Sequence, residues 1–400
     1  MNLDVQNKKV LVRVDFNVPL DASFSITDDT RMRSALPTIK HILDGGGAAI
    51  LCSHLGRPGK KLREDGSIDV ARFTLEHLVQ HLSKLTGAKV HFCPETVGDQ
   101  ATQMAAALKP GEILLLENTR FNPGEKKGDL AFAEALSKLG DLYINDAFGS
   151  AHRAHASTTT VAQFFTANTK SFGFLMQKEI EHASKVLNHP ERPLTAIVGG
   201  AKVSDKILLL EKMVHFVDNI LIGGGMAYTF LKAQGGEIGN SLFEEDRVET
   251  ARKLLITAEE KGVKIYLPVD SVIADNFDNN ANTKVVPSAE IPAGWMGLDI
   301  GAEARKTFSD VIKSSKMIIW NGPMGVFEME SFANGTLTIA NAVAEATEQG
   351  AFSLVGGGDS VSAVNKSGRS AQISFVSTGG GAMLEFLEGK TLPGVEAIQA

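Results

Sequence analysis

The chain has 400 residues, of which 43% are hydrophobic and 22% are charged, and its formal net charge is −7. This length exceeds what a single core usually holds, so two domains of about 200 residues each are expected. An acidic balance argues against a general nucleic-acid-binding protein, so any basic cluster is expected to be local and directed at a small ligand.

Cysteine content and hydropathy indicate a cytoplasmic protein. The two cysteines, Cys52 and Cys93, cannot build a disulfide framework and fit a reducing compartment. The first ten residues lack the apolar core of a signal peptide. No apolar run approaches the ~18 residues that cross a bilayer, so no membrane association is expected.

The first half of the chain alternates short β-rich runs with amphipathic stretches. Such alternation predicts a parallel sheet covered by helices. The expected strands are 9–14, 48–52, 90–93, 112–116 and 141–145, and the expected helices are 36–43, 73–85, 100–108 and 129–139.

The second half repeats this α/β architecture without a visible sequence repeat. An amphipathic helix over 175–187, followed by Pro190 and Pro193, is read as the connector between the halves. The polar, Asn-rich segment 275–284 is expected to be an exposed excursion. The expected strands are 194–198, 219–222, 264–267, 317–320, 353–355 and 373–375. The predicted division is an N-terminal domain over 1–172, a connector over 173–190, a C-terminal domain over 191–388 and a tail over 389–400.

Basic residues follow the strands of the first half at the edge where α/β sheets bind ligands. The planar guanidinium group of arginine suits carboxylate and phosphate groups. Any one arginine alone reads as a solvated surface charge, and the histidines are equally well explained by structural hydrogen bonds. Together they indicate a site for a small, multiply charged anion. The segments are Asp15-Phe16-Asn17, Ser53-His54-Leu55-Gly56-Arg57, Glu117-Asn118-Thr119-Arg120 and His152-Arg153-Ala154-His155, with Arg31 and Arg33 added.

Glycine runs follow the strands of the second half. Glycine lets the backbone approach a ligand, and a helix that starts just after it directs N–H groups at phosphate. Ser360 is predicted to cap such a helix, and Asp359 is predicted to hold Mg²⁺. Lys202 and Lys206, one helical turn apart, offer charges for phosphates. The runs are Gly199-Gly200-Ala201-Lys202, Gly223-Gly224-Gly225, Gly356-Gly357-Gly358-Asp359-Ser360 and Thr378-Gly379-Gly380-Gly381.

Better-known motifs are missing. A P-loop ending at Gly389-Lys390-Thr391 would need a glycine where Leu384 stands, and Tyr228 occupies the third glycine position of a dinucleotide fingerprint. The short Cys/His spacings around Cys52 and Cys93 favour core thiols over a zinc site. Gly45-Gly46-Gly47 ends a helix and is interpreted as a plain turn.

These motifs, in this order and spacing, resemble the phosphoglycerate kinase family from residue 10 to about residue 394. The segments that carry the resemblance are 12–19, 53–58, 117–121, 146–155, 199–206, 320–328 and 356–360. The resemblance implies two Rossmann-like lobes, with 3-phosphoglycerate or 1,3-bisphosphoglycerate on the first and Mg-ADP or Mg-ATP on the second, in a monomer. Because the expected ligand sites fall on separate lobes, a hinge is expected at 175–187 and its flanks, Gly173 and 190–193.

The resemblance also assigns roles by position. Arg31, Lys202, Gly357 and Gly358 would act in catalysis. The acid would contact Asp15, Phe16, Asn17, Arg31, His54, Leu55, Gly56, Arg57, Arg120 and Arg153. The nucleotide would contact Lys202, Lys206, Gly224, Asn321, Glu328, Gly357, Gly358, Asp359 and Ser360, with Asp359 at the metal and Glu328 at the ribose.

Two other classes of protein compete with this reading. A dehydrogenase binding NAD in the second lobe would need the fingerprint glycines, and the third is absent. A non-catalytic ligand sensor has no need for Lys202, Asp359 and a basic opposite lobe together.

Overall fold

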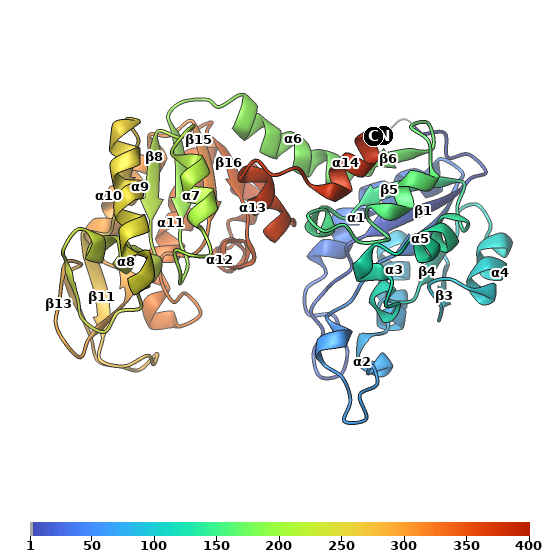
Figure 1. Ribbon diagram of the computed structural model, residues 1–400, viewed down its shortest axis with the longest axis horizontal. Helices are drawn as coiled ribbons and strands as arrows, with labels where there is room; N and C mark the ends of the chain where they lie inside the picture. The colour runs from blue at the N-terminus through green and yellow to red at the C-terminus, as the bar shows by residue number, and fades with distance from the viewer. Residues whose placement is uncertain (1–2) are drawn as a thin grey trace. The chain divides into compact units, whose positions relative to one another are not determined.

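The computed structural model describes residues 3–400 and divides the chain into two compact units (Figure 1). Unit 1 comprises residues 1–181 and 391–400, and unit 2 comprises residues 182–390. The helix α6 (Phe174–Asn188) runs from one unit into the other. Within residues 3–400, no helix combines the length and the apolar composition that a bilayer crossing needs.

Unit 1 contains a six-stranded sheet in which all neighbouring strands are parallel. Alternate residues of the strands β1 to β5 enter two hydrophobic clusters, one on each face: Val10 and Val12 belong to one, Leu11 to the other. Strands buried on both faces are typical of parallel sheets. The strand order is β3 (Val90–Cys93), β4 (Ile113–Leu116), β2 (Ala48–Cys52), β1 (Lys9–Val14), β5 (Leu142–Asp146) and β6 (Lys170–Phe172), and the helices are α1 (Thr30–Asp44), α2 (Val70–Phe73), α3 (Val79–Thr86), α4 (Asp99–Ala107), α5 (Leu130–Ser137) and α14 (Pro393–Gln399).

Unit 2 contains a second six-stranded parallel sheet and a smaller antiparallel one. The parallel order is β10 (Lys264–Tyr266), β8 (Asn219–Ile222), β7 (Leu194–Val198), β15 (Met317–Asn321), β16 (Phe352–Val355) and β17 (Phe375–Val376). The antiparallel order is β12 (Thr283–Pro287), β11 (Asp270–Ala274) and β14 (Met296–Ile300), and β9 (Glu237–Ile238) pairs with β13 (Glu290–Ile291). The helices are α7 (Ile207–Met213), α8 (Met226–Ala233), α9 (Val248–Glu260), α10 (Ala302–Lys313), α11 (Asn334–Glu348), α12 (Gly358–Ser367) and α13 (Gly381–Leu387).

The predicted parallel strands all exist, within two residues at each end, whereas several helices differ from expectation. The first helix begins at Thr30, not at residue 36, and Pro37 lies inside it. The predicted helix over 73–85 is broken at Thr74, whose backbone is extended and whose hydroxyl accepts a hydrogen bond from the N–H of Glu76. Side-chain capping of this kind stops one helix and starts the next.

Two segments form regular secondary structure that the sequence did not predict. The excursion over 275–284 ends in the edge strand β12, so the small antiparallel sheet was missed. The C-terminal residues, read as a tail, form α14, which lies beside β6 in unit 1 (Figure 1). Lys170 Nζ donates to the carbonyl of Ala397 at 2.9 Å, and Asn145 Nδ2 donates to that of Gly394 at 3.2 Å.

Candidate active site

Hydrogen bonds between loops build the ligand-facing edge of unit 1. The backbone N–H of Phe16, after β1, donates to Ser53 Oγ, after β2, at 2.8 Å. The N–H of Gly56 donates to Asn17 Oδ1 at 2.7 Å, and Arg120 Nη1, after β4, donates to the carbonyl of Gly56 at 2.7 Å. Three strand ends that are distant in sequence are therefore held as one surface.

Asp15 and Arg31 form an ion pair on this surface. Burial opposes ionisation of Asp15, but the charges of Arg31, His54 and Arg13 and a hydrogen bond from the N–H of Asn17 outweigh it and lower the pKa of the carboxyl group. Asp15 is thus a buried carboxylate that accepts hydrogen bonds, and it orients the Arg31 side chain.

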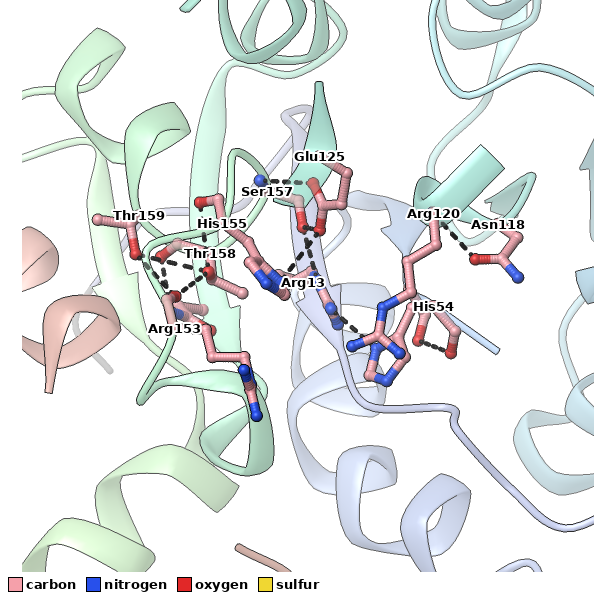
Figure 2. Close-up of polar contacts among 12 residues, drawn as sticks. Arg13, His54, Asn118, Arg120, Glu125, Arg153, His155, Ser157, Thr158 and Thr159 are labelled. Carbon is pink, nitrogen blue, oxygen red and sulfur yellow. Dashed lines mark hydrogen bonds and ion pairs between the residues drawn. The ribbon is translucent and has the colours of Figure 1, made fainter. Parts of the chain in front are cut away.

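Uncompensated positive charge gathers around His54. Burial, followed by the charge of Arg13, lowers the pKa of Arg120 to about 10, and the Arg120 Nε–H is buried without a hydrogen-bond acceptor among the described residues. In the described chain, no carboxylate forms an ion pair with Arg57, Arg120 or Arg153. Figure 2 shows His54, Arg120 and Arg153 in this region. Several cations without carboxylate partners make a site that fits a polyanion.

His155 is a buried neighbour of this cluster. Burial, and then the charges of Arg13, Arg120 and Arg153, lower the pKa of its imidazole to about 4. Its Nδ1 lies 4.0 Å from Glu125 Oε1 and has no hydrogen-bond partner among the described residues. His155 is therefore neutral at neutral pH and adds no charge to the cluster.

The predicted acid-binding residues fall into four groups. Asp15 presents a buried charge, Arg31 and Arg120 present partly buried ones, and Arg57 and Arg153 present exposed ones. Phe16 and Leu55 are buried and shape the edge through their backbone. Arg33 does not join the cluster, because it pairs at 2.8 Å with Asp29, the residue just before α1.

A cavity of about 680 Å³ opens at the corresponding edge of unit 2. Its walls are largely apolar, as in most sites that bury a planar ring system. Among the predicted nucleotide residues, Gly224, Glu328 and Asp359 line it. Other lining residues are Tyr228, Leu242, Pro268, Met296, Leu298 and Met324.

A hydrogen-bonded network joins the predicted phosphate-binding residues. Asn321 Nδ2 donates to the carbonyl of Gly356 at 2.8 Å, and Lys206 Nζ donates to Asn321 Oδ1. Burial lowers the pKa of the Lys206 ammonium group, while Asp359, Asp205 and Glu388 oppose this shift. Gly357 has φ +90°, and a Cβ there would also collide with Asn321. The turn before α12 therefore requires glycine.

Two sequence predictions about this edge are wrong. Ser360 does not cap α12: its Oγ accepts a hydrogen bond from the N–H of Gly322 at 2.5 Å, and no side-chain cap is present. Lys202 and Lys206 are not one helical turn apart, because α7 begins only at Ile207. Lys202 does not line the cavity, and its charge acts on Glu244. The glycine runs 223–225, 356–358 and 378–381 do lead directly into α8, α12 and α13.

Three charged residues at the two sheet edges were not predicted from the sequence. Arg13 and Asp299 are almost fully buried, Arg13 beside the cation cluster and Asp299 in the wall of the cavity. Lys126 joins the cations of unit 1, since burial and the charges of Arg120 and other cations lower its pKa. A charged residue inside an apolar strand run was the available signal for Arg13 and Asp299. Lys126 has none.

Asp359 is the predicted ligand for a metal ion. Among residues 3–400, no group of three or more His, Cys, Asp or Glu side chains could hold one. Mg²⁺ is commonly bound by one or two carboxylates together with substrate phosphates and water. The exposed carboxylate of Asp359, in the cavity wall next to the N-terminus of α12, fits this arrangement.

Comparison with known proteins decides the family. The family model described as phosphoglycerate kinase matches residues 1–390. The chain belongs to the phosphoglycerate kinase family. A phosphoglycerate kinase of Moorella thermoacetica is 52% identical over 397 residues, covering 99% of this chain and 98% of its relative. A cytosolic phosphoglycerate kinase of Triticum aestivum is 51% identical, covering 99% and 96%.

Solved structures of the family have the same fold. The phosphoglycerate kinase of Coxiella burnetii matches with a TM-score of 0.85 at 39% identity, covering 100% of this chain and 97% of that one. The phosphoglycerate kinase of Pyrococcus horikoshii matches with a TM-score of 0.84 at 30% identity, with the same coverage. These matches confirm the predicted α/β fold.

Family membership confirms the predicted activity. The chain is a glycolytic phosphotransferase that transfers a phosphoryl group reversibly between 1,3-bisphosphoglycerate and ADP. The alternatives of a dehydrogenase and a ligand sensor are thereby rejected.

Proposed function

We propose that the cation cluster of unit 1 binds 3-phosphoglycerate or 1,3-bisphosphoglycerate. Asp15, Asn17 and His54 would orient the acid, and Arg57, Arg120 and Arg153 would bind its charged groups. The observation that carries this proposal is the set of guanidinium groups without carboxylate partners at one sheet edge. Buried or clustered cations of this kind are stabilised when an anion binds.

The cavity of unit 2 would bind ADP or ATP. Its apolar walls would hold the base near Gly224, and the exposed Glu328 would accept hydrogen bonds from the ribose. The phosphates would then approach Lys206 and the N-terminus of α12, where Gly357 and Gly358 present backbone N–H groups. Lys202, outside the cavity lining, would reach only the outermost phosphate.

Asp359 would hold Mg²⁺ together with the nucleotide phosphates. Bound there, the ion would neutralise charge on the phosphate oxygens. Asn321 would keep the glycine turn and Lys206 in place around the phosphates.

The residues of this chain would act by positioning and by charge. In the ATP-consuming direction the nucleophile is a carboxylate, ionised at neutral pH because carboxyl pKa values lie near ~4. No general base is required. Arg31, oriented by Asp15, would stabilise the charge on the transferring phosphoryl group, together with Lys202 and the N–H groups of Gly357 and Gly358.

Location and assembly follow from the same reasoning. The relatives in Triticum aestivum and Arabidopsis thaliana are named cytosolic, and a cytoplasmic location is proposed for this chain. We propose a monomer, because the acid-binding and nucleotide-binding residues are all supplied by one chain.

A coupled assay tests the proposal. The protein is given 3-phosphoglycerate and Mg-ATP, and reduction of the acyl phosphate product is followed as loss of NADH. Activity that depends on both substrates and is lost on chelation of divalent ions supports the proposed sites. Activity that persists without divalent ions would remove the role given to Asp359.

A further inference from the structure

Arg13 is a charged residue next to the last position of the buried strand β1. Its exposed fraction is 0%, so it is not placed to touch a ligand. Its Nε donates to Ser157 Oγ at 2.8 Å, its Nη1 donates to the carbonyl of Val14, and its Nη2 lies 3.1 Å from His54 Nδ1. Figure 2 shows Arg13 between Ser157 and His54. The guanidinium group therefore connects the protein interior to a residue of the acid-binding site.

The direction of each hydrogen bond follows from chemistry. A guanidinium group can only donate, so both Ser157 Oγ and His54 Nδ1 accept from Arg13. The Ser157 hydroxyl uses its own hydrogen to donate to Glu125 Oε1 at 2.6 Å, and the Ser157 N–H donates to Glu125 Oε2 at 3.0 Å. Because Nδ1 of His54 accepts, it carries no proton.

We propose that Arg13 is a positioning residue that holds His54 as a neutral imidazole with its proton on Nε2, aimed at an acceptor oxygen of the bound acid. Glu125 and Ser157 hold Arg13 in turn. The choice of the acid as ligand rests on the function proposed above, whereas the tautomer follows from the contacts of Arg13 alone.

The charges around His54 support a neutral ring. His54 is 4% exposed, and burial is the largest effect that lowers its pKa well below the usual value. The Asp15 carboxylate opposes this, while Arg13, Arg120 and Arg31 reinforce it. Protonation of Nδ1 would also place an N–H against the N–H of Arg13.

The tautomer restricts what His54 can bind. A proton on Nε2 makes this atom a donor, so its ligand partner is a carboxylate, phosphate or hydroxyl oxygen. Nε2 has no hydrogen bond within the described chain, and it is not among the buried polar atoms that lack a partner. The donor is therefore available to a ligand from solvent.

Nuclear magnetic resonance of protein with ¹⁵N-labelled histidine tests the tautomer directly. The His54 signals, assigned by their loss in His54→Gln, are expected to show an unprotonated Nδ1 and a protonated Nε2 at neutral pH. A protonated Nδ1, or a doubly protonated ring at neutral pH, would overturn the proposal. This readout needs no substrate, so it stands even if the protein fails to phosphorylate 3-phosphoglycerate, a failure that would remove the proposed function only.

Variants test whether Arg13 must be held by Ser157 in order to position His54. Ser157→Ala removes the acceptor of Arg13 Nε and is expected to give a mixture of His54 tautomers. It should raise KM for 3-phosphoglycerate roughly tenfold, the usual effect of losing a hydrogen bond to a charged group, without changing KM for ATP. Arg13→Lys, which cannot bridge Ser157 and His54 together, should act in the same direction.

Ser137→Ala is the matched control. Ser137 is another buried serine of unit 1, and its hydroxyl donates to the carbonyl of Glu134 within its own helix. It should leave both the tautomer and KM unchanged. An unaltered His54 spectrum and an unaltered KM in a folded Ser157→Ala protein would refute the link between Arg13 and His54.

Discussion

Asp146 Oδ1 accepts a hydrogen bond from the backbone N–H of Met176 at 3.1 Å, so the last residue of β5 caps the first turn of α6. Thr38 completes the cap, because its hydroxyl accepts from the N–H of Phe174 at 2.9 Å. Gly173 lies so close to the Asp146 carboxyl group that a Cβ there would collide with it. The N-terminal end of the connector helix is thus anchored to unit 1.

Asp146 is predicted to make stability depend on pH. Burial raises the pKa of its carboxyl group to about 6, although hydrogen bonds from Thr38 and Met176 oppose the shift. A folded-state pKa above the unfolded value of ~3.9 means that folding favours the protonated form of Asp146. The stability that this form contributes is therefore lost as pH rises from about 4 to about 6.

Asp146→Asn should remove this dependence, because an amide does not titrate and still offers an acceptor to Met176. The difference in the free energy of unfolding between the variant and the wild type is expected to rise, in favour of the variant, by about 2–3 kcal/mol from pH 4 to pH 7. Urea unfolding of both proteins across this range measures the difference. A constant difference would show that Asp146 does not titrate there.

Arg31→Ala is predicted to lower kcat more than it weakens acid binding, because Arg31 would stabilise charge that develops during transfer. A charge-stabilising arginine in phosphoryl transfer is worth roughly 10³–10⁵ in rate. Arg33→Ala, on the same helix but paired with Asp29, is the control and should be near wild type. Arg57→Ala and Arg153→Ala should instead raise KM for the acid. A loss of less than about tenfold in kcat for Arg31→Ala would contradict the proposed role.

Asp359→Asn is predicted to weaken nucleotide binding and its dependence on Mg²⁺, while 3-phosphoglycerate binding stays near the wild-type value. The reason is that Asp359 lines the cavity of unit 2, whereas the proposed acid site lies in unit 1. Separate calorimetric titrations of the two ligands measure the effects. Equal losses for both would identify Asp359 as a structural residue at the start of α12.

Binding of both substrates is predicted to reduce the radius of gyration. In-line transfer requires the reacting atoms to lie ~3–3.5 Å apart, and the proposed acid and nucleotide sites belong to different units. Only the two ligands together favour a state that unites them. Small-angle scattering of active protein with each ligand and with both tests this. An unchanged radius with both ligands would refute a closing motion.

The repeating local pattern of the chain was enough to predict its architecture. Apolar runs such as 9–14 and 194–198 are continuous because both faces of their strands are buried, and glycine or polar residues follow each one. Motif order also identified the family, and the parallel arrangement brought the basic strand ends onto one edge. These properties depend on residues that are close together in the sequence, so the sequence was sufficient to predict them.

Only the tertiary structure decided which partner each side chain has. Ser360 looked like a helix cap, but Gly322, 38 positions away, donates to it. Arg13 looked like part of a strand motif, but it contacts Ser157, 144 positions away, and His54. A hydrogen bond depends on distance and direction in space, and residues far apart in the sequence meet only when the sheet is assembled. The local sequence therefore shows which residue types the site contains, whereas the fold determines their protonation and orientation.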